Sequence, residues 1–213
     1  MAETKPDTSE LAYGRTELDD HVHLPTNTGL SNEKLTMWAF LGSDCLLFGA
    51  LISTYLLLRN RTGRDTTGPT AADLFDIPFT SASSFVLLMS SLTMVLAVSS
   101  ISRGEIERCK MWLLTTASLG AMFIAGQVYE FTSFYREGLG YTTNISSSAF
   151  YTLTGFHGVH VSLGIVMLVS LWMLVQRGSL TRADAETVEI IGLYWHFVDI
   201  VWIVIFAIVY LIP

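Results

Sequence analysis

Three short stretches of this sequence, QVYE, HGVH and HFVD, carry polar side chains three residues apart inside otherwise apolar segments. The pairs are Gln127 with Glu130, His157 with His160, and His196 with Asp199. Side chains at this spacing share one face of an α-helix. Two further acids, Asp44 and Glu189, lie in or beside segments of the same kind. Because ionisable groups are costly to bury in apolar surroundings, each of these residues is a candidate for function.

A metal or haem site is one chemistry that these residue types could support. Di-iron bundles use Glu-x-x-His pairs on two helices, and no such pair occurs among the three stretches. Haem held between two helices needs histidines at matched depth. The histidines here lie near the starts of consecutive antiparallel segments, which puts them at opposite faces of a membrane. We therefore expect that this chain binds no metal and no haem.

Two other roles remain open for the polar residues: a path for protons, or locks between helices. Asp44 and Glu130 are suitable members of a proton path, although the broken helices and inverted repeats of transporters are not evident. For Asp44 the two roles have equal weight. For His157 and His160, which lie among glycines, we favour close helix contact with hydrogen-bonded histidines.

The same choice arises for the third pair, His196 and Asp199. We favour a structural role in which hydrogen bonds to each other or to neighbouring helices orient both side chains. The two cysteines, Cys45 and Cys109, lie in different segments and indicate neither a disulfide framework nor a metal cluster.

The segments that position these residues are long and apolar. The chain has 213 residues, 51% of them hydrophobic and 15% charged, where soluble domains have about 25% charged residues. Segments of about 20 apolar residues are long enough to cross a hydrocarbon core of about 30 Å as helices. Five such runs occur, at 38–58, 79–101, 111–135, 147–175 and 190–212. Their apolar character is continuous, unlike that of barrel strands, so we predict an all-α, polytopic membrane protein with one domain of five transmembrane helices over residues 36–213.

The first 35 residues differ from the rest in being rich in acids, and the whole chain has a net charge of −7. This segment lacks the apolar stretch of a secretory signal and is too acidic for a mitochondrial transit peptide. We predict that residues 1–35 form a flexible, cytoplasmic arm. With the N-terminus inside, most of the 12 Lys and Arg residues fall on the cytoplasmic side. The positive-inside rule therefore favours an N-in, C-out orientation.

Four stretches together resemble subunit III of the haem–copper terminal oxidases. AFYTLTGFHGVHVSLG (149–164) and YWHFVDIVWIVIFAIVY (194–210) resemble the last two helices of that family. SLGAMFIAGQVYEF (118–131) resembles the preceding helix, and LGSDCLLFGALISTYLLLR (41–59) resembles the helix with the family's Ser-Glu pair. The resemblance covers residues 35–211. Asp44 stands where the family usually has glutamate, and the chain has five helices, as in many bacterial members, where others have seven.

The resemblance implies a function for the chain and roles for its polar residues. Subunit III is non-catalytic and binds no haem or copper, which belong to partner subunits. Its helices form a cleft that holds structural phospholipids, and it packs against subunit I in the bacterial plasma membrane, where it protects that subunit and supports proton uptake. By position, Asp44 is the cleft carboxylate. The remaining family polar set is Gln127, Glu130, His157, His160, Glu189, His196 and Asp199.

The resemblance also implies that the complex reduces oxygen and pumps protons in the electron transport chain of aerobic respiration. Arg177 and Arg182, at the predicted cytoplasmic end, are candidates for lipid headgroup contacts. Nothing indicates a nucleic-acid partner. Two alternatives remain: an accessory subunit of nitric oxide reductase, and a stand-alone proton-coupled transporter. Co-purification with haem-containing partners separates the transporter from the oxidase subunit.

Overall fold

The computed structural model describes residues 31–59 and 75–212. The chain divides into a first unit, Met1–Thr36, and a second unit, Met37–Pro213. Residues 1–30 of the predicted arm lie outside the described residues. Residues 32–35, which were predicted to belong to the arm, instead form the first turn of a helix. The cause is local, because the Ser31 hydroxyl accepts a hydrogen bond from the Lys34 backbone N–H and so caps that turn.

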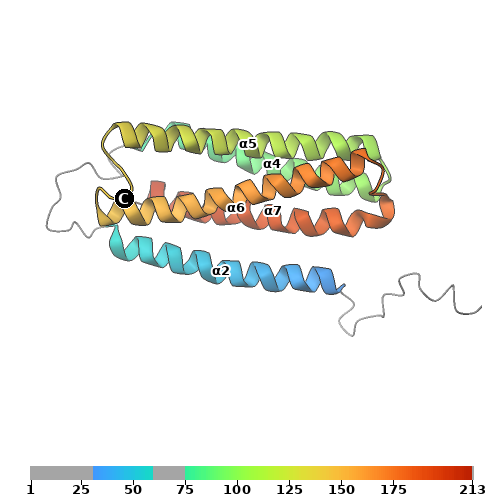
Figure 1. Cartoon of the computed structure of the whole chain (residues 1–213), viewed down its shortest axis with the longest axis horizontal. Coiled ribbons are helices and arrows are strands. Elements are labelled where there is room, and N and C mark those ends of the chain that lie inside the picture. The colour runs from blue at the N-terminus through green and yellow to red at the C-terminus, as the bar shows by residue number, and fades with distance from the viewer. Residues whose placement is uncertain (1–30, 60–74, 213) are drawn as a thin grey trace, which may run out of the picture. The chain divides into compact units, whose positions relative to one another are not determined.

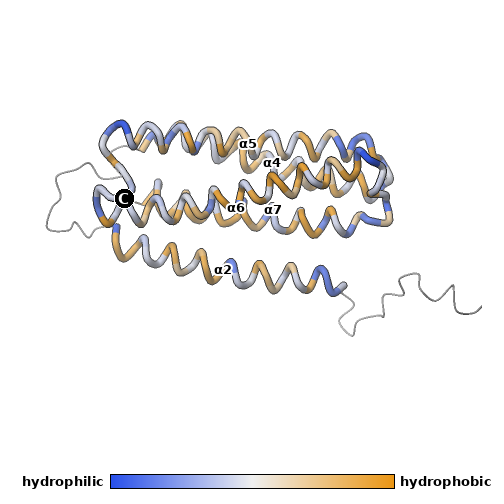
Figure 2. Tube along the Cα trace, viewed as in Figure 1, coloured by the Kyte–Doolittle hydropathy of each residue, from blue (hydrophilic) through white to orange (hydrophobic). Residues whose placement is uncertain are grey.

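Five long helices within residues 31–59 and 75–212 confirm the predicted all-helical membrane architecture. They are α2 (Asn32–Leu58), α4 (Ile77–Ser102), α5 (Ile106–Arg136), α6 (Ile145–Gln176) and α7 (Ala185–Phe206). A 3₁₀ turn, η1 (Arg182–Asp184), precedes α7, and a π-helical turn, η2 (Ala207–Leu211), continues it. Each of the five spans is long and apolar enough to cross a membrane. The tube in Figure 2 shows apolar residues along the helices and polar residues at their ends.

Helices α4, α5, α6 and α7 form an antiparallel bundle in which α4 and α6 each pack against both α5 and α7 (Figure 1). Polar caps fix where these helices begin. The Asp76 carboxylate accepts from the Phe79 N–H at the start of α4, and Asn144 forms a reciprocal capping box with Ser147 at the start of α6. These caps therefore fix the residues at which α4 and α6 begin.

Helix α2 is the least buried of the five spans. Its buried residues, Leu41, Asp44, Phe48 and Tyr55, recur at intervals of three, four and seven and so form one narrow stripe. Phe48 contacts the His160 ring of α6, with ring centroids 5.0 Å apart. This stripe supplies the buried contacts of α2 with the bundle, and Phe40, beside it, adds a ring contact with Tyr194 of α7.

Trp195 of α7 fills the centre of the bundle. A Cβ added to Gly120 of α5 would lie 2.5 Å from the Trp195 ring, and one added to Gly164 of α6 would lie 2.8 Å from it. The indole Nε1–H donates to Ser90 of α4 over 3.0 Å. Two glycines and one serine thus bring three helices against a single buried indole.

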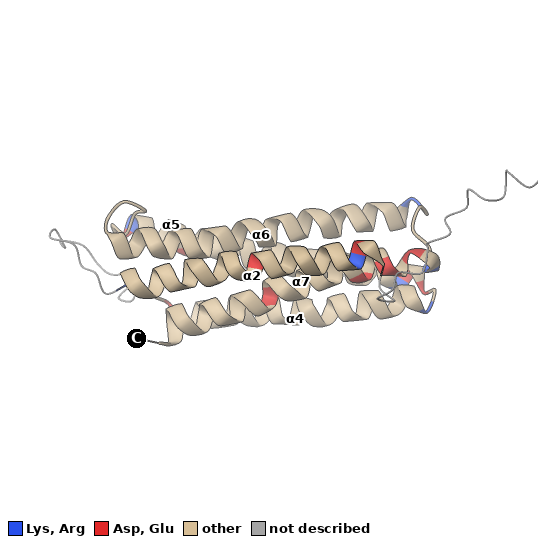
Figure 3. Ribbon diagram, turned by 90° about the horizontal axis from the view of Figure 1, so that it is seen from below, with Lys and Arg blue, Asp and Glu red and all other residues tan. Residues whose placement is uncertain are grey.

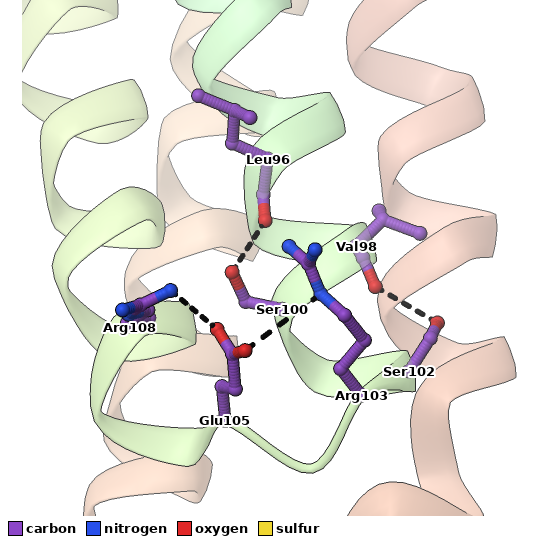
Figure 4. A network of polar contacts seen from close by, with 7 residues as sticks. All are labelled: Leu96, Val98, Ser100, Ser102, Arg103, Glu105 and Arg108. Atoms are coloured by element: carbon purple, nitrogen blue, oxygen red, sulfur yellow. Dashed lines mark hydrogen bonds and ion pairs between the residues drawn. The ribbon is translucent and has the colours of Figure 1, made fainter.

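Charged side chains of the bundle collect mainly at its ends (Figure 3). The turn between α4 and α5 is short because Gly104 adopts a positive φ of 80°, which favours glycine. In this turn the Glu105 carboxylate lies 3.0 Å from Arg108 Nη1 and 3.9 Å from Arg103 Nε (Figure 4). These exposed ion pairs contribute little to stability, about 0–1 kcal/mol each, but they neutralise much of the charge in this turn.

Candidate functional site

Asp44 and His160 form a polar contact between α2 and α6, near the middle of both helices. His160 Nε2 lies 3.6 Å from Asp44 Oδ2, and both side chains are nearly enclosed. His160 Nδ1 lies 2.8 Å from the carbonyl oxygen of Phe156. Because a carbonyl only accepts, Nδ1 carries the hydrogen, and in a neutral ring Nε2 then turns a lone pair toward the carboxyl group. At this distance the two groups do not form a hydrogen bond, and Asp44 Oδ2 has no hydrogen-bond partner among the described residues.

His157, one turn before His160, lies in the core and not at this contact. Its side chain is fully buried, and neither ring nitrogen has a hydrogen-bond partner among the described residues. The ring stacks on Trp202 with centroids 4.8 Å apart and meets the edges of Phe48 and Phe123. The expectation of a hydrogen-bonded histidine is therefore wrong for His157, because aromatic rings of three other helices surround it.

Gln127 joins α5 to α6. Its amide Nε2–H donates to the carbonyl oxygen of Thr154 over 2.9 Å. The other end of the amide lies against Gly158, where an added Cβ would be 2.7 Å from Gln127 Oε1. The missing side chain of Gly158 provides the space for this amide, as expected for small residues at helix contacts in membranes.

Glu130 shares a helix face with Gln127 but contacts different helices. The Thr80 hydroxyl of α4 donates to Glu130 Oε1 over 2.8 Å, and the Tyr210 hydroxyl donates to Oε2 over 3.3 Å. Tyr210 belongs to the π-helical turn η2. Thr80 lies in the first turns of α4, at the end of the helix whose dipole favours an acidic group. Glu130 thus joins three helices near one end of the bundle.

His196 and Asp199 do not bond to each other directly. Ser91 of α4 lies between them: its hydroxyl is 2.5 Å from His196 Nδ1 and is also a hydrogen-bond partner of the Asp199 carboxyl group. Asp199 is buried, and its Oδ1 has no hydrogen-bond partner among the described residues. Of the two arrangements considered from the sequence, the structure has the interhelical one, between α7 and α4.

The remaining predicted residues lie toward the end of the bundle that carries the α4–α5 and α6–α7 connections. Glu189 is partly buried in the second turn of α7. Arg177 and Arg182 are exposed on either side of the α6–α7 turn, and no ion pair joins them to any residue in the described ranges. By contrast, Lys110 at the same end pairs with Glu107 over 2.7 Å.

Several contacts rest on residues that the sequence did not single out: Phe48, Thr80, Ser91 and Tyr210. Hydroxyl side chains in apolar helices commonly bond to their own backbone, as Thr115 and Ser118 do here, so sequence alone does not distinguish the bridging ones. Within residues 31–59 and 75–212, no group of three or more His, Cys, Asp or Glu side chains is arranged to hold a metal ion.

Comparison with known proteins identifies the family of this chain. A family model described as cytochrome c oxidase subunit III matches residues 20–212. Cytochrome c oxidase subunit 3 of Bacillus sp. (strain PS3) is 38% identical over 180 residues, which cover 84% of this chain and 86% of the relative. Cytochrome c oxidase subunit 3 of Alkalihalophilus pseudofirmus is 36% identical over 195 residues, covering 91% and 93%. The probable quinol oxidase subunit 3 of Staphylococcus saprophyticus is 38% identical over 179 residues, covering 84% and 88%.

These matches span all five helices and the polar residues that join them. Relatives named for cytochrome c and for quinol share the same degree of identity with the chain. The five helices of the described residues that are long and apolar enough to cross a membrane all lie within the part of the chain that the family model matches. The chain belongs to the cytochrome c oxidase subunit III family, and it is a multi-pass membrane subunit of a haem–copper oxidase.

Proposed function

We propose that this chain is a non-catalytic subunit of a proton-pumping terminal oxidase, which it serves by stabilising the catalytic subunit I, holding phospholipids and supporting proton uptake. The observation that carries this proposal is the family match along residues 20–212. Haem and copper then belong to partner subunits, and oxygen is reduced there. The chain lies in the bacterial plasma membrane with its N-terminus and acidic arm in the cytoplasm, consistent with its bacterial relatives and its distribution of basic residues.

A role in proton uptake centres on Asp44. Its carboxyl group faces His160 Nε2, and the hydrogen on Nδ1 is committed to the Phe156 carbonyl. A proton placed between Asp44 and His160 stabilises their contact, whereas its loss leaves a lone pair facing a carboxylate. This geometry supports Asp44 as a proton-holding group, and buried acids in membrane helices often serve proton movement.

A role in holding lipid has support at two places on the bundle. A groove of about 350 Å³ runs between α5 and α6 and is mostly apolar; Gly155, Gly158 and Ser162 line it on the α6 side. It suits an acyl chain, because these small side chains leave space and Ser162 already donates to the Gly158 carbonyl. At the cytoplasmic end, Arg177 and Arg182 suit anionic headgroups, since each basic residue near such a surface gains about 1 kcal/mol.

Purification tests this function. Membranes that contain the tagged chain are solubilised in mild detergent, and the purified material is assayed for haem absorbance and oxygen consumption. We expect haem-containing subunits and oxidase activity to co-purify with the chain. A complex that lacks the chain should lose activity faster during prolonged turnover. Isolation of the chain without haem proteins, together with proton-coupled uptake by the chain alone in liposomes, would contradict the proposal.

A further inference from the structure

His196 is an imidazole on the outward face of α7, near the middle of the span Arg182–Leu211 and therefore near mid-depth of a membrane that this span crosses. The expectation that it lies near one membrane face is wrong, because the helix begins several residues before the apolar run. His196 lies about 16 Å along the helix from Ala185, taking a rise of about 1.5 Å per residue. Its side chain is only partly buried. Ile200 and Ile203, one and two turns further on the same stripe, are 60% and 47% exposed. A partly exposed imidazole at this depth would face acyl chains, which offer no hydrogen-bond partner.

The neighbouring helix α4 extends this face. Ser91 contacts His196 Nδ1, and Leu88 and Val95, on either side of Ser91 along α4, are 42% and 51% exposed. We call this surface the α4–α7 face; it comprises Leu88, Ser91, Val95, His196, Ile200 and Ile203. It has a polar centre and an apolar rim, so a partner that covers it in the membrane must satisfy the imidazole and also pack against aliphatic side chains.

The positions of the hydrogens on Ser91, His196 and Asp199 determine whether His196 Nε2 is a hydrogen-bond donor or an acceptor. A net charge is strongly disfavoured at this depth, and two neutral forms of the Ser91, His196 and Asp199 cluster leave no hydrogen on Asp199 Oδ1. That oxygen is buried and has no hydrogen-bond partner among the described residues, so a hydrogen there would have no acceptor. In the first, the Asp199 carboxylic acid donates to Ser91, and the Ser91 hydroxyl donates to His196 Nδ1. In the second, the His196 Nδ1–H donates to Ser91, and the Ser91 hydroxyl donates to the Asp199 carboxylate.

The two forms differ only by the shift of two protons along the same hydrogen bonds. In both, His196 Nε2 carries a hydrogen: as the N–H of a neutral ring in the first form and of an imidazolium in the second. Nε2 has no hydrogen-bond partner among the described residues, and it is not fully enclosed by them, so it is accessible at the surface of the chain. The α4–α7 face therefore presents an N–H donor to whatever covers it.

We propose that the α4–α7 face binds a transmembrane helix of another oxidase subunit, and that this helix provides a hydrogen-bond acceptor to His196 Nε2–H. Lipid headgroups carry acceptors but lie at the membrane surfaces, away from mid-depth. A protein helix brings an acceptor to this depth and also covers the exposed rim residues. The inference rests on the proposed assembly with other oxidase subunits, and it specifies which face of the chain makes the contact.

Two substitutions of His196 separate its outward and inward hydrogen bonds. In His196→Gln the longer side chain brings an amide N–H to the position of Nε2 and gives up the contact with Ser91. In His196→Asn the amide takes the position of Nδ1, keeps the contact with Ser91 and removes the outward donor. Retention of the chain in the purified oxidase is measured by gel filtration over a detergent series, with haem absorbance marking the complex.

We expect His196→Asn to weaken retention about 3- to 10-fold, the range set by one interhelical hydrogen bond in a membrane, and His196→Gln to retain the chain within about twofold. Equal loss in both variants, or loss in neither, would overturn the proposal. The melting temperature of each isolated variant shows whether it still folds. If both variants unfold, the cross-linking experiment that follows decides.

A photo-activated cross-linking residue at Ile200 identifies the neighbour directly in the intact complex. We expect a cross-link to another oxidase subunit. Cross-links to lipid alone, to water or to a second copy of this chain would refute the assigned face, even where the chain co-purifies with haem subunits. Failure to co-purify at all would instead refute the proposed function, so the two failures are distinguishable.

Discussion

Trp195 lies between Gly164 and Gly120, so a single methyl group added to Gly164 should measurably destabilise the bundle. In Gly164→Ala the new Cβ would lie 2.8 Å from Trp195 Cε3 and Cζ3. The indole is 99% buried and bonded to Ser90. The ring cannot simply move away, because its other side lies against Gly120 of α5, so closely that a Cβ added there would be 2.5 Å from the ring. The strain must therefore shift a helix or break the hydrogen bond to Ser90.

The magnitude follows from these two costs. Extra methyl groups in a well-packed core cost about 1–3 kcal/mol, and loss of the hydrogen bond from Trp195 to Ser90 adds about 1 kcal/mol. We expect Gly164→Ala to lower the free energy of unfolding by about 2–4 kcal/mol. The control is Gly155→Ala in the same helix, where an added Cβ has no atom within 4 Å. That variant should be neutral or slightly stabilising, since alanine favours a helix over glycine by about 0.5–1 kcal/mol.

The assay is equilibrium unfolding of the purified chain in mixed micelles as the fraction of denaturing detergent rises, followed by tryptophan fluorescence and circular dichroism. A second substitution tests the mechanism: Trp195→Phe provides a smaller ring, so it should cost less in the Gly164→Ala background than in the native chain. Such non-additivity is expected for residues in contact. If Gly164→Ala unfolds at the same detergent fraction as Gly155→Ala, the packing account of Trp195 is wrong.

Three further predictions concern the polar residues and the groove. Asp44→Asn should leave assembly intact, because its amide N–H can donate to the lone pair of the facing histidine, but it should slow proton uptake in stopped-flow measurements; unchanged kinetics would make Asp44 a packing residue. Glu130→Gln should cost about 1–2 kcal/mol in the detergent assay, since an amide has one oxygen for two hydroxyl donors; an unchanged transition would contradict that bonding. Gly155→Leu should fill the groove, and its Cβ would meet no other atom within 4 Å, so native mass spectrometry should detect fewer bound lipids. Replacing Arg177 and Arg182 by Gln should reduce the number of bound anionic lipids only. Unaltered lipid content in both cases would remove these two sites from the account.

The sequence was sufficient to predict the five membrane helices because bilayer thickness sets a minimum length for an apolar run. It placed their starts less well: α2 begins at Asn32 and α5 at Ile106, where apolar runs were recognised only from residues 38 and 111. Hydropathy marks the part of a helix that crosses hydrocarbon. The helix itself begins earlier, where a cap such as Ser31 satisfies its first backbone N–H groups.

Spacing along the helices predicted which polar side chains share a face but not what they contact. Gln127 and Glu130 lie one turn apart, yet one bonds to α6 and the other to α4 and η2. His157 was expected to be hydrogen-bonded and is instead enclosed by aromatic rings. Such contacts depend on how separate helices rotate against one another, and a periodic pattern within one helix does not encode that rotation.

The proposed role of this chain as a structural subunit of a haem–copper oxidase can be tested by comparing the time course of oxygen consumption with and without it. The oxidase is purified through a tag on the chain, and a matched preparation is made from cells that lack the chain. We expect haem absorbance to co-purify with the tagged chain and both preparations to start at comparable rates. The preparation without the chain should then lose activity sooner during continuous turnover. Equal lifetimes for the two preparations, or a tagged chain isolated free of haem proteins, would contradict the proposed role.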